Sequence, residues 1–379
     1  MIIDEKSFSC VPQEVSEFTV QSALRSYRVI FDNASHPIET INQAIKNNFL
    51  LIDKNVLAHW GQDLSIESSK MLVIDASENF KTFTGLTEIL DFLSGAKATK
   101  NDTLVVVGGG VLHDVGGFAA AIYHRGMRWI HFPTTLLAMC DSCIGGKTAV
   151  NYHQAKNQIG LFYPPHEVVI NPNFLRTLPE DMVRSGLGEI LKQCIMGGKR
   201  FLDLYCQAIQ RGNVVKWDDY KKLISAALTV KRCIVEADEF ELHERKALNY
   251  GHTLGHAVEV LSDYAIPHGS AVVIGILFAN QLSYLDKQLS LEEKNQLDQL
   301  CIDLLSDAVR NALKKINLDF LLDVLQKDKK IFTGQLNFVL LKSVGEIYFK
   351  SISDLHDIDA CARRFVTTVL NYESIVETR

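Results

Sequence analysis

The first half of the chain alternates short apolar runs with stretches of helical periodicity. Apolar positions recur at helical spacing over residues 86–93. Four runs rich in β-branched and other apolar residues are predicted to be strands, at residues 49–53, 70–75, 103–107 and 129–132. Strands that are apolar throughout and alternate with helices are typical of a parallel sheet covered on both faces. We therefore expect a Rossmann-like α/β nucleotide-binding domain over residues 1–175.

The second half has a different pattern, in which helical periodicity dominates from about Leu178 onward. The exception is a hairpin predicted around residues 336–349, with its turn near Gly345. Pro172 and Pro179 lie where the pattern changes, and prolines commonly mark such boundaries. We expect a mostly α-helical domain over residues 176–379, with the site in the cleft between the two domains.

Composition and charge narrow the class of protein. The 379 residues are 47% hydrophobic and 22% charged, which suits two buried cores and excludes a disordered chain. The net charge of -6 argues against nucleic-acid binding, which normally uses a basic surface. No apolar run reaches the ~20 residues of a membrane span, and the acidic N-terminus is unlike a signal peptide. We expect a cytoplasmic protein with neither nucleic acid nor membrane as a partner.

A glycine-rich turn at residues 108–110 follows a predicted strand and opens a helix. Glycines there let the backbone approach a pyrophosphate at the helix N-terminus. The spacing differs from Gly-x-Gly-x-x-Gly, so a purely structural turn is the alternative. Two neighbouring strands are followed by Asp53 and Asn55, and by Glu78 and Lys81. Polar side chains at the carboxyl ends of parallel strands favour contacts to ribose and adenine, which supports dinucleotide binding.

A second group of residues has the chemistry of a metal site. Glu189 and Lys192 are three residues apart and share one face of a predicted helix. His252 and His256 are four apart on another, and His268 follows at a turn. One glutamate and two histidines bind zinc while leaving a position open for substrate. The spacing is not His-Glu-x-x-His, so a zincin protease is excluded.

Several cations lie near glycine turns instead of along solvated helix faces. In a net-acidic chain this placement favours a small anionic substrate, such as a sugar phosphate or a carboxylate. Gly145-Gly146-Lys147 lacks the glycine that a Walker A motif needs at position 141, which argues against an ATPase. The cations are Arg125, Lys147, Lys156, Lys192, Lys231, Arg245 and Lys330.

In their order along the chain, these motifs resemble the 3-dehydroquinate synthase family of the sugar phosphate cyclase superfamily. Its members use NAD and a divalent metal, usually zinc, with Co²⁺ as the alternative here, and they commonly form homodimers. The resemblance covers roughly residues 45–345. It rests on residues 108–114, 123–126, 133–135, 141–151, 156–157, 189–192, 245, 249–252, 267–269 and 328–330.

The resemblance implies roles for individual residues. The metal ligands would be Glu189, His252 and His268. Arg125 would reach the substrate phosphate from the neighbouring subunit. The NAD contacts would be Asp53, Asn55, Glu78, Lys81, Gly109, Gly110, Asp114, Thr134, Thr135, Asp141, Lys147 and Lys156. The remaining residues around the substrate would be Asp141, Lys147, Asn157, Lys192, Lys231, Arg245, Asn249, His256 and Lys330. Catalysis would fall to Lys147, Lys192, Arg245, Asn249 and His256, the last moving protons.

The reaction that the resemblance implies converts 3-deoxy-D-arabino-heptulosonate 7-phosphate into 3-dehydroquinate and phosphate. NAD oxidises a ring hydroxyl to a ketone, which acidifies the neighbouring C–H, and phosphate leaves by β-elimination. NADH then returns its hydride, the ring opens, and an intramolecular aldol addition closes the carbocycle. NAD is regenerated in each cycle, and the enzyme would be a carbon-oxygen lyase acting on phosphates.

Related reactions stay open at this point. The 2-deoxy-scyllo-inosose synthases tend to carry an acid where Asn249 stands, and the 2-epi-5-epi-valiolone synthases tend to lose His256. Both residues therefore favour dehydroquinate synthase or its amino-dehydroquinate relative, whereas Ser270 and Gly188 depart from the usual Glu and Ala. Metal-dependent polyol dehydrogenases share the two-domain plan but commonly use an aspartate where Glu189 stands. A non-catalytic binding protein would be expected to lose metal ligands that are all present.

Overall fold

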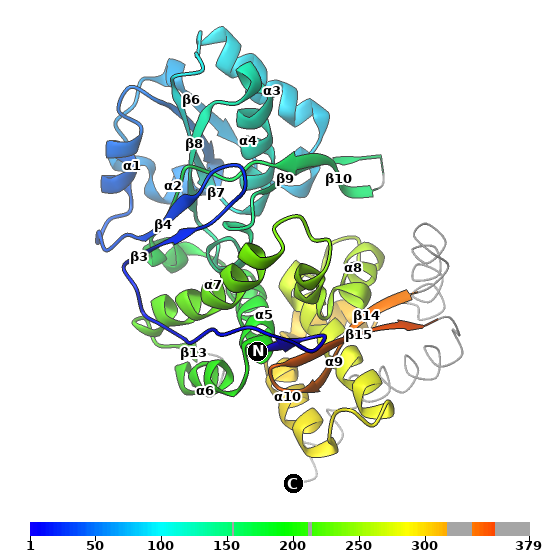
Figure 1. Cartoon of the computed structure of the whole chain (residues 1–379). Helices are drawn as coiled ribbons and strands as arrows, with labels where there is room; N and C mark the ends of the chain where they lie inside the picture. Colours follow the sequence, from blue (N-terminus) through cyan, green and yellow to red (C-terminus); the bar gives the residue numbers. More distant parts are fainter. Residues whose placement is uncertain (154, 211–213, 317–335, 353–379) are drawn as a thin grey trace. The chain divides into compact units, whose positions relative to one another are not determined.

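The computed structural model describes residues 1–153, 155–210, 214–316 and 336–352 (Figure 1). Its contacts divide the chain into two compact units. The α/β unit comprises Gln13–Pro179 and Tyr220–Leu228, and the helical unit comprises Met1–Pro12, Glu180–Asp219 and Thr229–Arg379. In the part of the chain described, no helix combines the length and apolarity needed to cross a membrane.

A seven-stranded sheet forms the centre of the α/β unit. The strand order is β3-β4-β11-β8-β7-β5-β6, and all neighbouring pairs are parallel except β3 with β4. Their bounds are β3 Glu17–Val20, β4 Tyr27–Phe31, β5 Phe49–Asp53, β6 Met71–Ile74, β7 Thr103–Gly108, β8 Arg128–Pro133 and β11 Glu167–Ile170. The four predicted strands are β5 to β8, and the parallel α/β architecture is confirmed. Strands β3, β4 and β11, which extend the sheet beyond β8, were not predicted from the sequence.

Helices cover the sheet because its strands are apolar on both faces. Leu51 and Val106 on one face pack against Ile89 of α3 and Leu112 of α4. On the other side of the sheet lie α1 and α2 (Figure 1). The helix bounds are α1 Ile38–Ala44, α2 Lys54–Trp60, α3 Phe83–Gly95 and α4 Gly110–Ile122. A separate hairpin, β9 Lys147–Tyr152 with β10 Ala155–Phe162, packs against α4.

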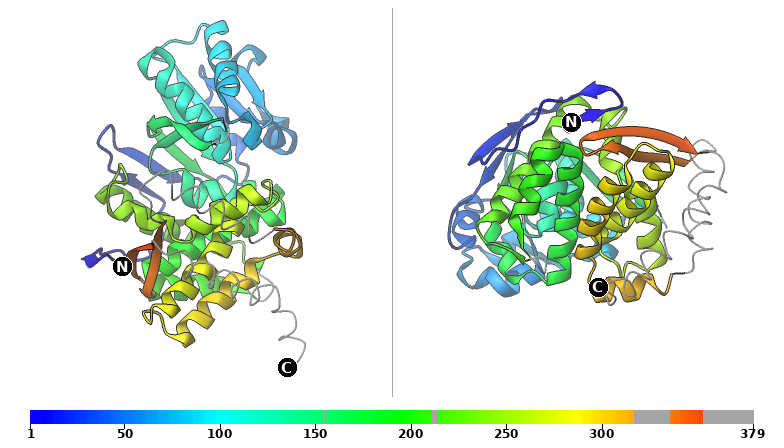
Figure 2. Two further views of the ribbon diagram at one scale, coloured as in Figure 1. Left: turned by 90° about the vertical axis from the view of Figure 1, so that its right-hand side faces the viewer. Right: turned by 90° about the horizontal axis from the view of Figure 1, so that it is seen from below.

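The helical unit is built around α9 (His268–Leu285), which contacts α5, α8 and α10 (Figure 2). The residues of α9 are buried along almost its whole length, as its uniformly apolar sequence predicts. The other helices are α5 Glu180–Gly197, α6 Lys199–Ala208, α8 His252–Leu261, α10 Leu291–Leu304 and α11 Asp307–Leu313. Helix α7 (Asp219–Ala237) is divided, because its residues Tyr220–Leu228 belong to the α/β unit and the rest to the helical unit. The short strands β12 Ile209–Gln210 and β13 Val214–Val215 pair with each other.

A small sheet in the helical unit includes the predicted hairpin. Strands β14 (Leu336–Ser343) and β15 (Glu346–Ile352) are antiparallel, and Gly345 makes the turn with a φ of +86°. The beginning of the chain joins the same sheet, because β1 (Ile2–Ile3) pairs in parallel with β15 and antiparallel with β2 (Lys6–Ser7). The first twelve residues therefore belong to the helical unit, although the sequence pattern predicts them in the α/β domain.

Candidate active site

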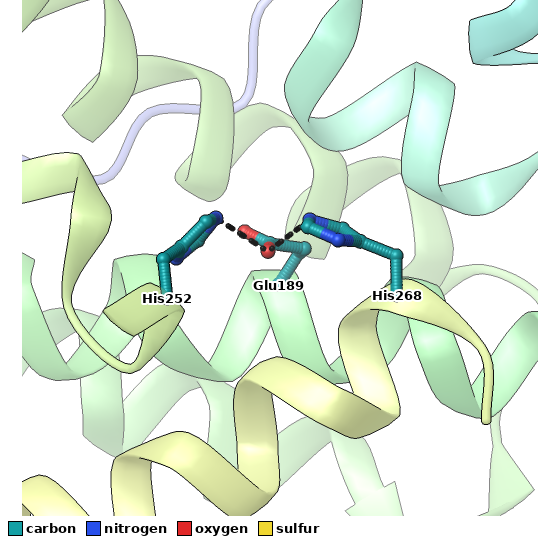
Figure 3. A group of neighbouring side chains, drawn as sticks. All are labelled: Glu189, His252 and His268. Carbon is teal, nitrogen blue, oxygen red and sulfur yellow. Dashed lines mark ion pairs between the residues drawn. The ribbon is translucent and has the colours of Figure 1, made fainter. Parts of the chain in front are cut away.

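Three predicted metal ligands meet in the helical unit. Glu189 lies in the middle of α5, while His252 and His268 are the first residues of α8 and α9. Both imidazoles point at the same carboxylate (Figure 3): Oε1 of Glu189 is 3.7 Å from Nε2 of His252 and 3.4 Å from Nε2 of His268. One ligand atom from each residue lies within 4.8 Å of the others. Two imidazole nitrogens and a carboxylate oxygen are a donor set that suits zinc.

The carboxylate of Glu189 is completely buried, which is costly without a compensating cation. Lys192 supplies part of this compensation, with Nζ 2.7 Å from Oε2 of Glu189. Burial acts to raise the pKa of Glu189, but Lys192 and the two histidines hold it well below its usual value. Among the described residues, neither oxygen of Glu189 accepts a well-aligned hydrogen bond. A divalent cation would satisfy these buried oxygens, so the residues present fit a metal.

The two histidines are in different electrostatic environments. Burial and the charge of Lys192 hold the pKa of His252 well below its usual value. Burial would also lower the pKa of His268, but Glu189 and Glu259 outweigh it and raise the pKa to about 10. In the absence of metal, the carboxylates therefore favour a charged His268 beside a neutral His252.

Close helix packing brings these ligands together. A Cβ on Gly269 would lie 1.8 Å from the backbone oxygen of Ser185 on α5, and one on Gly275 would lie 1.8 Å from that of Gly251. Only glycine permits α9 to approach its neighbours so closely at both points. Gly251 also takes a left-handed conformation with φ +81°, which positions the start of α8. The glycines that punctuate this half of the sequence thus determine the geometry of the metal cluster.

Other predicted site residues lie in the same unit. Lys192 donates a 2.8 Å hydrogen bond to the backbone oxygen of Leu248, next to Asn249. The ring of His256 is exposed, and its centroid is 5.2 Å from that of His252. Lys192 contacts Glu189 and His256 contacts His252, so both lie beside the metal ligands. Lys330 lies outside the described residues.

The segment before Asn249 is held by the carboxylate of Asp238 and by the backbone oxygen of Glu239. Asp238 accepts backbone hydrogen bonds from Leu242, His243 and Arg245 at 2.7–3.0 Å. Although burial acts in the opposite direction, these bonds lower the pKa of Asp238. Arg245 is buried, and its guanidinium donates to the backbone oxygen of Glu239. Lys231 is also buried, on the neighbouring α7.

The residues predicted to bind a dinucleotide lie in the α/β unit. The glycine turn links β7 to α4, with Gly109 as the N-cap and no capping side chain. A Cβ on Gly109 would lie 3.0 Å from Cγ2 of Thr135, and Thr134 donates a 3.1 Å hydrogen bond to the oxygen of Gly108. The free N–H groups of a helix N-terminus favour an anion, so this turn can receive a pyrophosphate.

Polar residues surround the glycine turn at the carboxyl end of the sheet. Asp53 ends β5 and caps α2 by accepting a 2.7 Å hydrogen bond from the backbone N–H of Asn55. Lys81 forms a largely buried ion pair with Asp114 on α4. Glu78 accepts a 2.7 Å hydrogen bond from the side chain of Asn151. The structure therefore brings these predicted residues to one edge of the sheet.

The remaining predicted residues lie on loops and the hairpin of the same unit. Asp141 is in a short π-helical segment, Ala138–Ser142, and Lys147 is exposed at the start of β9. Lys156 and Asn157 are on β10, where the hairpin register shifts, and Asn157 has a φ of +54°. Arg125 is exposed after α4 and is also left-handed, with φ +61°.

Several residues that support the site were not predicted from the sequence. Glu259 lies 3.2 Å from His268, and Glu241 accepts a 2.8 Å hydrogen bond from Asn249. A buried histidine pair lies beside the glycine turn: Nδ1 of His113 is 3.0 Å from Nδ1 of His131, whose Nε2 is 3.3 Å from the oxygen of Gly108. Only Glu259 has a sequence signal, because it follows His256 by three residues on one helix face.

The sequence matches two models, which describe the N-terminal and C-terminal parts of the proteins of one family. Residues 71–185 match "3-dehydroquinate synthase N-terminal", and residues 186–331 match "3-dehydroquinate synthase C-terminal". A 3-dehydroquinate synthase of Pelagibacter ubique is 35% identical over 87% of this chain and 93% of its own length. That of Clostridium beijerinckii is 34% identical over 89% of this chain and 98% of its own.

Solved structures share the fold. A 2-deoxy-scyllo-inosose synthase complexed with carbaglucose-6-phosphate, NAD⁺ and Co²⁺ has a TM-score of 0.81 at 23% identity, covering 92% of this chain and 99% of its own. ValA, a 2-epi-5-epi-valiolone synthase from Streptomyces hygroscopicus with NAD⁺ and Zn²⁺ bound, has a TM-score of 0.75 at 24% identity. The match covers 91% of this chain and 99% of the ValA chain. Identities this low establish the fold alone. The match of both family models over most of the chain, with full-length relatives above 30% identity, shows that this chain belongs to the 3-dehydroquinate synthase family.

Proposed function

We propose that this protein is an NAD- and metal-dependent lyase that converts 3-deoxy-D-arabino-heptulosonate 7-phosphate into 3-dehydroquinate and phosphate. The observation that carries the proposal is the buried carboxylate of Glu189 facing two imidazoles, in a chain of this family. A bound metal at this cluster would serve as a reaction centre. A non-catalytic binding protein would have no need to bury such a carboxylate. The family membership favours a cyclase over a net dehydrogenase.

Glu189, His252 and His268 would hold the metal, which is Zn²⁺ or Co²⁺ in the solved neighbours. A bound divalent cation would polarise substrate hydroxyls and stabilise a developing oxyanion. The chain itself supplies a dry setting for this chemistry, because Glu189 is fully buried and Lys192 is almost so. In such a setting each charge acts more strongly than it would in water.

Gly109 and Gly110 would receive the pyrophosphate of NAD, with Asp53, Asn55, Glu78 and Lys81 near its sugar and base. NAD supplies a hydride acceptor and later returns the hydride. The ion pair of Lys81 with Asp114 neutralises a carboxylate that stands on the first turns of α4. Without this pairing, the carboxylate would repel an incoming pyrophosphate.

The phosphate of the substrate would be bound by Lys147, Asn157, Arg245 and, outside the described residues, Lys330. Asp141 and Lys231 would complete the polar contacts to the substrate. The phosphate leaves with the electron pair of its C–O bond, after the neighbouring carbon has given up a proton. Nε2 or Nδ1 of the exposed His256 could carry protons between substrate and solvent. Nζ of Lys192 is fixed by Glu189 and the Leu248 carbonyl, so it would orient a substrate hydroxyl.

We also propose a cytoplasmic homodimer in which Arg125 reaches the site of the neighbouring subunit. Arg125 is exposed at the end of a short 3₁₀ turn, Tyr123–Arg125, and has a left-handed backbone. An Arg125→Ala variant mixed with an inactive Glu189→Gln variant tests this point. If the sites are shared, mixed dimers would regain activity at one site, whereas independent sites would leave both variants inactive.

The function is tested by phosphate release from purified, metal-loaded protein with catalytic NAD. Heptulosonate phosphate, sedoheptulose 7-phosphate and glucose 6-phosphate are supplied in parallel, and Glu189→Gln is the control for the metal site. Turnover with the first alone, abolished by a chelator, supports dehydroquinate synthase. Turnover with either of the others assigns the chain to another cyclase reaction. Net accumulation of NADH with a polyol, without phosphate release, would overturn the proposal.

A further inference from the structure

His268 uses both nitrogens of its imidazole ring. Nε2 lies 3.4 Å from Oε1 of Glu189, and Nδ1 lies 3.2 Å from Oε2 of Glu259. The two acids come from different helices, α5 and α8, and contact opposite edges of the ring. Both carboxylates are buried. The ring is therefore fixed from two sides, with its Nε2 turned toward the other metal ligands (Figure 3).

We propose that Glu259 is a positioning residue for the metal site, which holds His268 in the Nδ1–H tautomer and directs its Nε2 lone pair at the metal. The proposal rests on the metal-dependent function above. An ionised carboxylate only accepts hydrogen bonds, so its partner nitrogen must carry the proton. The proton on Nδ1 leaves Nε2 unprotonated in the neutral ring, as metal binding requires. A carboxylate partner also makes the imidazole a stronger electron donor.

The surroundings of Glu259 distinguish it from an incidental surface charge. Glu259 is only 4% exposed and lies in the last turns of α8. Its backbone oxygen accepts hydrogen bonds from Tyr264 N at 2.9 Å and from Ser262 Oγ at 3.0 Å. The backbone of Glu259 thus closes the turn that leads to α9, while its side chain orients the first residue of that helix. A carboxylate is rarely buried in this way unless a partner compensates it.

The second histidine ligand offers an internal comparison. Nδ1 of His252 is 3.2 Å from the backbone oxygen of Tyr250, a neutral acceptor. Both imidazoles therefore present Nε2 to the metal cluster, but only His268 is supported by a charged group. A change at Glu259 should weaken the bond from His268 and leave that from His252 intact.

A different arrangement must be distinguished, because His256, Glu259 and His268 also lie close enough to hold an ion themselves. In that arrangement Glu259 would be a direct ligand of a second metal, bound at Nδ1 of His268. The positioning role predicts one metal per chain, whereas a second site predicts two.

The test is Co²⁺ binding to the full-length chain, stripped of metal, followed by the cobalt visible absorption and by competition with a chelator. For Glu259→Gln we expect one equivalent of Co²⁺ bound 10–100-fold more weakly, the usual loss when a carboxylate behind a metal-bound histidine is removed. The band positions should stay close to those of the wild type, since the three ligands remain. Glu259→Asp, which keeps the charge but shortens the reach, should give an intermediate loss. Glu292→Gln is the control, because it makes the same charge change at an exposed position.

Unchanged Co²⁺ affinity in both Glu259 variants, with native circular dichroism, would overturn the proposal. Loss of one of two bound equivalents would also overturn it and assign Glu259 to a second metal site. If Glu259→Gln does not fold, Glu259→Asp decides the question by the same measurement. Metal affinity is read without turnover, so an inactive wild type that binds Co²⁺ would refute the proposed function and leave this inference intact.

Discussion

Gly275→Ala should perturb the metal site without touching any proposed ligand. Gly275 lies on α9, where an added Cβ would stand 1.8 Å from the backbone oxygen of Gly251 and 3.0 Å from the N of Gly255. Real Cβ atoms essentially never come within 3.0 Å of such a neighbour, so α8 and α9 would have to separate by about 1.2 Å. The next residue after Gly251 is His252, so the displacement reaches a proposed ligand directly.

The expected magnitude follows from two opposing effects. Overpacking of this kind costs about 1–3 kcal/mol. Alanine is the better helix former by about 1 kcal/mol, which offsets part of that cost. We expect a net destabilisation of up to about 2 kcal/mol. Metal–ligand distances tolerate shifts of only about 0.2 Å, so a movement of about 1.2 Å should weaken metal binding at least tenfold.

The assays are thermal unfolding of the metal-free protein and Co²⁺ affinity by chelator competition. Gly95→Ala is the matched control, because an added Cβ there would have no neighbour within 4 Å. It lies at the end of α3 and should leave both measurements within error or stabilise slightly. Wild-type stability and metal affinity in Gly275→Ala would refute the argument that glycine contacts determine the ligand geometry.

Three further perturbations test the electrostatics of the chain. Lys192→Met should destabilise the metal-free protein by about 3–5 kcal/mol, the usual cost of removing one partner of a buried ion pair. Zinc should restore most of this stability, and an equal loss of Tm with and without zinc would contradict the prediction. Lys81→Met should weaken NAD binding measured by fluorescence titration, because the carboxylate of Asp114 is left uncompensated; unchanged affinity would exclude a role for the pair. The Cys10 side chain, by a hydrogen bond, lowers the pKa of Cys233 to about 7, so Cys10→Ala should move the midpoint of Cys233 alkylation to higher pH. An unmoved midpoint, read by mass spectrometry of iodoacetamide labelling, would show that the thiol contact is unimportant.

Much of the fold is determined by local patterns in the sequence. The strands β5 to β8 are mostly apolar because most of their residues are buried, and such runs are visible without any structure. The hairpin of β14 and β15 is predicted for a similar reason, with Gly345 in the left-handed turn. Glu189, His252 and His268 could be named as candidates because few side chains have suitable chemistry. Which two of the three histidines face Glu189 came from the family resemblance.

Other features depend on residues far apart in the chain, and only the tertiary structure decides them. The first strand, β1, pairs with β15 at the opposite end of the described chain. The sequence does not predict this pairing, because a two-residue strand carries no pattern of its own. The spacing of Glu259 from His256 is visible in the sequence, but its role depends on the turn that places His268 beside it. The ligand geometry depends on backbone contacts of Gly269 and Gly275, which lack side chains to signal a partner. Sequence therefore determines which groups are available, whereas long-range packing of α5, α8 and α9 decides which of them meet.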